Sequence, residues 1–95
     1  MEKKNFGTMI SALREEKKMS LSALAEAAKK AGFKRKVSTT FLSKVESGQT
    51  VPSVKIIEAL AKALSASLKP LLDQAREDAI VIATEKINKR FLLTK

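Results

Sequence analysis

The chain of 95 residues contains neither cysteine nor histidine. Disulfide bonds, Cys/His zinc sites, thiol nucleophiles and imidazole general bases are therefore excluded. Tryptophan and tyrosine are also absent, so we do not expect the aromatic platforms on which single-stranded bases stack. The carboxylates are scattered, and there is neither a phosphate-cradling glycine loop nor a nucleophile–base pair. We therefore expect a protein that is not an enzyme and that needs no cofactor and no metal.

Long hydrophobic runs are lacking as well. No apolar stretch approaches the roughly 20 residues that a membrane-spanning helix needs, and the first residues do not form a secretory signal. We expect a soluble, cytoplasmic protein with no membrane partner. The length fits one domain, and a hydrophobic content of 44% is enough for a core.

Positive charge is the excess in this composition. Nineteen lysines and arginines against ten acidic residues give a net charge of +9. A small basic domain indicates a polyanionic partner, with nucleic acid ahead of an anionic membrane or an acidic protein. Residues 29–36 hold five cations and no anion. From charge alone, a solvated loop explains this cluster as well as contact with a polyanionic partner does.

Apolar residues recur at helical spacing, and strand signals are nearly absent. Four helices are expected before residue 67, the first over about residues 6–17. Their predicted inward faces are Phe6, Met9, Ile10 and Leu13; Leu21, Leu24, Ala25 and Ala28; Phe41, Leu42 and Val45; and Val54, Ile57, Leu60, Ala61 and Leu64. Serines stand where N-caps belong and glycines where helices end: Ser20, Ser38 (or Thr39) and Ser53, with Gly32 and Gly48.

The C-terminal part of the chain allows two interpretations. Apolar residues at steps of three or four favour one long helix that begins near Ser67, holds Pro70 in its first turn and runs to about Arg90. The β-branched run over residues 79–83 is also compatible with a strand. We favour the helix, because the flanking polar residues keep helical phase and no hairpin turn is visible.

The segment Leu42-Ser43-Lys44-Val45-Glu46-Ser47-Gly48, followed by Pro52-Ser53, resembles the XRE family, the DNA-binding domain of phage repressors and Cro proteins. Residues 10–16, 20–25 and 57–64 resemble that family's first, second and fourth helices, so the similarity covers residues 6 to about 72. It implies an all-α, five-helix, lambda-repressor-like helix-turn-helix domain over residues 1–72. Residues 73–95 would then be a C-terminal helical extension.

The resemblance also implies which residues read DNA. The third helix would lie in the major groove, with Thr39, Thr40 and Lys44 at groove-facing positions and Ser43 within reach of a base or a phosphate. Lysine can bind guanine O6 and N7, and threonine offers a hydroxyl and a methyl that can touch thymine. The alternative for the two threonines is that they are only cap and first-turn residues.

A second set would contact phosphates: Ser38 at the start of the third helix, and Ser47, Gln49 and Thr50 just beyond its end. For each of the last three, an ordinary exposed turn is almost as good an explanation. The chain departs from the family where Leu21 replaces the usual glutamine. It departs again in a longer connection from Gly32 to Ser38. Its cations Lys34, Arg35 and Lys36 are predicted to contact phosphates too.

By the same resemblance, Arg14 should pair with Glu46 and orient the third helix without touching a base. The alternative is two independent surface charges. Glu46 is the sole anion between Ala27 and Ile57, which favours the pair.

One recognition helix covers only a few base pairs, so we expect a homodimer that binds an inverted repeat. The hydrophobic pattern predicts a core that is complete by about Leu72, which leaves the apolar residues beyond it without a partner in a monomer. We expect these to form the dimer interface: Ala79, Ile80, Ile82, Ile87 and Phe91. Alternatively, this helix packs back on its own domain.

The sequence thus predicts a sequence-specific regulator of transcription that binds double-stranded DNA, with a repressor expected. The alternative is a helical protein-interaction module, for example antitoxin-like, with only non-specific affinity for DNA. A protein partner on the C-terminal helix would fit that alternative. A membrane-surface helix over residues 68–90 is opposed by its acidic residues, which anionic lipid would repel.

Overall fold

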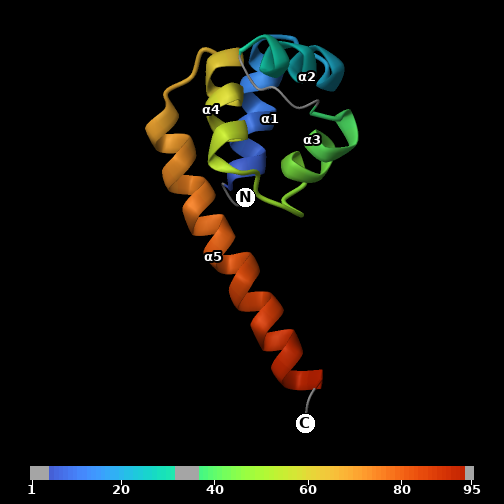
Figure 1. The fold of residues 1–95 in the computed structure, drawn as a ribbon, viewed down its shortest axis with the longest axis vertical. Coiled ribbons are helices and arrows are strands. Elements are labelled where there is room, and N and C mark those ends of the chain that lie inside the picture. The colour runs from blue at the N-terminus through green and yellow to red at the C-terminus, as the bar shows by residue number, and fades with distance from the viewer. Residues whose placement is uncertain (1–4, 32–36, 94–95) are drawn as a thin grey trace.

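A computed structural model describes residues 5–31 and 37–93 of the chain, with side chains through Ile87 in the last helix. The described residues form five α-helices and no strand: α1 (Phe6–Glu16), α2 (Leu21–Lys30), α3 (Thr39–Glu46), α4 (Val54–Ala63) and α5 (Leu68–Leu93) (Figure 1). The predicted all-α fold is confirmed. Helix α5 runs through residues 79–83, so the strand interpretation of that segment is wrong.

Side-chain caps fix where three of the helices begin. Asn5 forms a capping box with Thr8 at the start of α1. Ser20 and Ser38 each accept a hydrogen bond of 3.0 Å from the N–H three residues on, which satisfies an otherwise unpaired donor of the first turn. Ser53 holds the N-cap position of α4, as predicted, but its side chain makes no capping bond. Gly32, expected to end α2, lies outside the described residues.

Three helices end in the same way, with one residue in the left-handed conformation. Gly48 has φ +83° after α3, as its glycine suggests. Lys18 follows α1 with φ +56° and Ser65 follows α4 with φ +52°, although neither residue is a glycine. In each case the next N–H reaches back to a carbonyl of the last turn, at 2.8–3.0 Å. These turns keep the connections that follow α1, α3 and α4 short.

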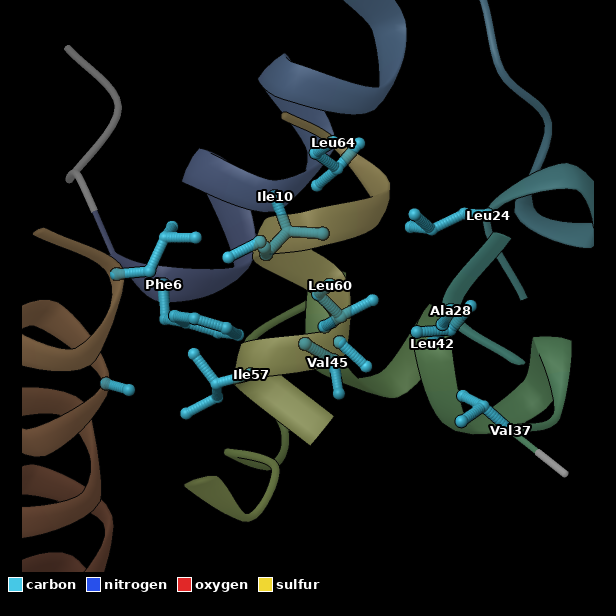
Figure 2. Packing of buried hydrophobic residues seen from close by; sticks show 14 residues of the cluster. Phe6, Ile10, Leu24, Ala28, Val37, Leu42, Val45, Ile57, Leu60 and Leu64 are labelled. Carbon is cyan, nitrogen blue, oxygen red and sulfur yellow. The ribbon is translucent and has the colours of Figure 1, made fainter. Parts of the chain in front are cut away.

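Helices α1 to α4 surround a single core (Figure 2). Leu24, Leu42 and Leu60 are completely buried, as are Ile10 and Val45. Because α4 packs against both α2 and α5, it buries residues on two faces, including Ala59.

One predicted core position is wrong: Val54 is 56% exposed. It stands in the first turn of α4, beside a connecting segment that covers this end of the core in its place. Pro52 of that segment is buried and Val51 is half-buried against the core.

Helix α5 belongs partly to this body and partly extends away from it (Figure 1). It begins beside Ser67 with Pro70 in its first turn, as predicted. The helix continues across residue 72 without a break, and Leu71 and Ala75 are both buried in the core. Ile82 is half-buried, and the side chains of residues 83–87 are all exposed. We call residues 79–93 the α5 tail.

Candidate nucleic-acid interface

Helix α3 has one buried and one exposed face. Leu42 and Val45 are fully buried, and at 100° per residue they point to the same side of the helix. The opposite side carries the residues predicted to read bases, all of them exposed: Thr39, Thr40, Ser43 and Lys44. The structure therefore brings these four side chains together on one outward surface, which we call the α3 face.

The start of α3 is suited to a negatively charged ligand. The Ser38 hydroxyl oxygen accepts from the Phe41 N–H, while the first hydrogen bond inside the helix runs from the Leu42 N–H to the Ser38 carbonyl. Helix geometry leaves the N–H groups of Thr39 and Thr40 without a partner in the helix. Unpaired N–H groups and the helix dipole together attract a phosphate.

A hollow of about 340 Å³ lies between α2 and the start of α3. Its lining includes Thr39 and Ser38 together with Lys29 and Glu26. The hollow therefore places a cation and a carboxylate beside the N-terminal end of α3. A carboxylate accepts hydrogen bonds from the amino groups of cytosine or adenine but repels phosphate, so Glu26 adds an acceptor to a surface that otherwise favours anions. No sequence motif had pointed to Glu26.

Ser47 and Gln49, two of the residues predicted to contact phosphates, are hydrogen-bonded to each other beyond the end of α3. The Ser47 hydroxyl donates to the Lys44 carbonyl at 3.1 Å, and the Gln49 side-chain amide donates to the Ser47 oxygen at 3.0 Å. Both residues are exposed, and Thr50 is half-buried. This turn thus presents an ordered polar surface next to the α3 face.

The other end of α3 is fixed by Arg14 and Glu46. The Arg14 guanidinium donates two hydrogen bonds to the Glu46 carboxylate, of 2.7 Å and 3.0 Å, and a third of 2.7 Å to the Met19 carbonyl. The two side chains are only 17% and 11% exposed. The hydrogen bond to Glu46 raises the pKa of Arg14 above its already high value. A bidentate pair of this kind sets the orientation of both helices.

Gly7 is a residue to which sequence analysis assigned no role. It is buried in the first turn of α1, directly against the backbone carbonyls of Val45 and Glu46 at the end of α3. A glycine inside a helical pattern is the sequence signal for such a close approach. Gly7 and Arg14 therefore hold the same end of α3 against α1.

The chain departs from the family pattern at Leu21 and in the connection from Gly32 to Ser38. Lys34, Arg35 and Lys36 lie outside the described residues. Leu21 is half-buried and packs against the core, so it does not replace the polar contact that a glutamine would make at that position.

The α5 tail carries the residues predicted for a dimer interface. Ile80 is 61% and Ile87 58% exposed, and a spacing of seven residues places them on one side of the helix. Ala79 is exposed and Ile82 is half-buried, while the Phe91 side chain lies outside the described part of the structure. Ile80 is about 200° around the helix from Asp78, whose side chain contacts α1. The two isoleucines therefore lie on the side of α5 that faces away from the body.

No helix of the described ranges is both long and apolar enough to cross a bilayer. Within those ranges, no group of three or more acidic side chains could hold a metal ion.

Comparison with known protein families gives a match that runs from α1 to the start of α5. The sequence model of a family described as helix-turn-helix matches residues 10–71, which is more than half of the chain and includes α2, α3, Arg14 and Glu46. No curated protein and no solved structure gives a significant match.

Proposed function

The chain belongs to the XRE-type helix-turn-helix family of DNA-binding transcription regulators, and we propose that it is a repressor that binds an inverted-repeat operator as a homodimer. The observation that carries this proposal is the α3 face. Four exposed polar side chains stand on a helix whose opposite side is buried and whose last turn is fixed by the Arg14–Glu46 pair. A short, rigidly held helix with a polar outer face fits the major groove.

In this proposal the α3 face reads the bases. Lys44 donates to guanine O6 and N7, and Thr39 and Thr40 contact bases near the start of the helix through hydroxyl and methyl groups. Ser43 lies between them and reaches a base or the neighbouring phosphate. Each good base contact contributes about 1–3 kcal/mol of discrimination, so a few contacts in each half-site are enough for a specific regulator.

Phosphate contacts set the register of the protein on the duplex. Ser38 and the N–H groups of Thr39 and Thr40, which have no partner within the helix, bind a phosphate at the start of α3. Ser47, Gln49 and Thr50 bind another beyond its end. These two sites bracket the α3 face, and the net charge of +9 supplies the long-range attraction to DNA.

The α5 tail joins two protomers through the side that carries Ile80 and Ile87. Isolated exposed isoleucines are ordinary on a protein surface, but two on one stripe of a helix that extends from the body form a seam that a second copy can cover. Two-fold pairing presents two α3 faces to successive major grooves. A dimer bound over a promoter then represses by excluding the polymerase.

Selection of duplexes from a random library by the purified protein, at about 0.15 M salt, tests this function. At that ionic strength, non-specific backbone binding is weakened. Enrichment of an inverted repeat, and reduced transcription from a promoter that contains it, are the expected results. Retention of all duplexes alike, with a steep fall as salt rises, would contradict the proposal and favour the protein-interaction module.

A further inference from the structure

A carboxylate of α5 caps the start of α1. The Phe6 N–H donates to Asp78 Oδ2 at 2.6 Å, and the Gln74 side-chain amide donates to Asp78 Oδ1 at 3.0 Å. Phe6 is the first residue of α1, which has no acidic residue in its own first turn. Asp78 therefore supplies, from 72 residues away, the negative charge that a helix N-terminus favours.

This contact lies where α5 leaves the body. Ala75, one turn earlier, is buried in the core, and the side chains of residues 83–87 are exposed. Ile80, which begins the proposed dimer seam, follows Asp78 by two residues. Among the described residues, the bond from Phe6 is the one side-chain hydrogen bond that joins α5 to another helix.

The first turn of α1 is in turn fixed to the recognition helix. Gly7, next to Phe6, lies against the carbonyls of Val45 and Glu46, and Arg14 binds Glu46 further along α1. A continuous series of short contacts thus runs from Asp78 through the start of α1 to the end of α3.

We propose that Asp78 is a positioning residue that fixes the angle between the α5 tail and α3, and thereby sets the spacing of the two half-sites that a dimer accepts. This inference rests on the proposed function. The helix extends about 22 Å from Asp78 to its end, so a change of about 10° at Asp78 moves that end by about 4 Å. Since one base pair rises about 3.4 Å, such a change alters the accepted spacing.

The angle can be measured without DNA. The chain has no native cysteine, so spin labels at Lys55→Cys on α4 and Glu85→Cys on the α5 tail are specific, and dilution with unlabelled protein isolates distances within one protomer. We expect a narrow distance distribution for the parent protein. Asp78→Ala should broaden it at least about twofold, and Asp78→Asn, which keeps an acceptor oxygen, should restore it.

Matched variants separate positioning from general damage. Asp73→Ala removes an exposed carboxylate of the same helix whose ion pair with Lys69 stays within α5, and it should leave the distribution unchanged. Should Asp78→Ala fail to fold, Gln74→Ala removes only the bond that orients the carboxylate and should broaden the distribution partly. Equal widths for the parent, Asp78→Ala and Gln74→Ala would overturn the proposal.

The consequence for DNA is tested with inverted repeats whose spacer is varied one base pair at a time. The parent protein should prefer one spacer, whereas Asp78→Ala should bind neighbouring spacers within about threefold, with unchanged affinity for a single half-site. A broadened distance distribution with unchanged spacer preference would overturn the role in spacing. If the parent protein enriches no inverted repeat, the proposed function fails, and the label distances alone decide whether Asp78 fixes the angle.

Discussion

Gly7 of α1 and Val45 of α3 are in direct backbone contact. A Cβ atom on Gly7 would overlap the Val45 carbonyl oxygen and would lie 2.6 Å from the carbonyl oxygen of Glu46. The Arg14–Glu46 ion pair joins the same two helices about two turns further along α1. Helix α3 is therefore held at its C-terminal end by a backbone contact and by a side-chain contact.

Replacing Gly7 with alanine should destabilise the protein by about 1–3 kcal/mol, because the added methyl forces α1 away from α3. The sign is diagnostic, since alanine normally stabilises a helix relative to glycine by about 0.5–1 kcal/mol. Denaturant unfolding measures the difference. Ser22→Ala, at an exposed position of α2, serves as the control and should stay within about 0.5 kcal/mol of the parent. A stabilised Gly7→Ala protein would show that the two helices do not meet at this point.

The Arg14–Glu46 pair should show strong energetic coupling. Removing either side chain leaves a charged partner in a mostly buried position, so each single alanine variant should lose about 1.5–3 kcal/mol of unfolding free energy. The double variant should lose much less than the sum. The exposed Lys69–Asp73 pair, at 3.6 Å, is the control for this cycle, and its coupling should be below about 0.5 kcal/mol. Additive losses at Arg14 and Glu46 would contradict a direct interaction.

The stability from Arg14 should not vary near neutral pH. Because the hydrogen bond to Glu46 raises the pKa of Arg14, its contribution is fully present below the pKa of the unfolded state and is lost only as the pH rises through the higher folded value. Both lie in the strongly alkaline range. The loss in unfolding free energy caused by Arg14→Ala should therefore be equal at about pH 6 and pH 8. A loss that differs by more than about 1 kcal/mol would contradict this assignment.

The serines at the N-cap positions of α3 and α4 should respond differently to removal. Ser38→Ala deletes the hydrogen bond from the Phe41 N–H and should cost about 1 kcal/mol. Ser53→Ala, before α4, deletes no side-chain capping bond and should be nearly neutral. Thermal unfolding of both variants provides the comparison, and equal losses would mean that the cap of α3 is not what stabilises its start.

Charge on the α5 tail should abolish self-association. Ile80→Asp combined with Ile87→Asp places two carboxylates on the proposed seam, so sedimentation should show a monomer where the parent protein is a dimer. Binding to an inverted repeat should weaken while binding to one half-site is retained. Val54→Asp, at a comparably exposed apolar residue on α4, is the control and should leave the dimer intact. A dimer that survives both tail substitutions would place the interface elsewhere.

Much of the fold could be predicted because the helix starts are local. Ser20 and Ser38 cap the helices that they precede, and Gly48 adopts the left-handed conformation that glycine favours. Lys18 and Ser65 adopt that same conformation without a glycine, so no residue type marked the ends of α1 and α4. These ends are set by hydrogen bonds of the preceding turn and by packing of the next helix.

Tertiary packing explains what sequence analysis missed. Val54 fits the helical period of the α4 core face, but the segment that contains Pro52 covers that end of the core. Asp78 was expected only to be polar, because nothing in its neighbourhood indicates a partner 72 residues earlier in the chain. The exposed α3 face and the Arg14–Glu46 pair were predictable from the family motif, whereas the contact of Gly7 with the end of α3 required the structure.

The base-reading role of Lys44 is the central claim, and one set of binding free energies tests it. The parent protein and Lys44→Ala are measured on the enriched operator and on every single-base-pair variant of it, with Lys62→Ala, an exposed lysine of α4, as the control. We predict that Lys44→Ala loses about 1–3 kcal/mol on the operator and no longer discriminates at one position of each half-site. An equal loss on every duplex would contradict the claim and assign Lys44 to the phosphate backbone.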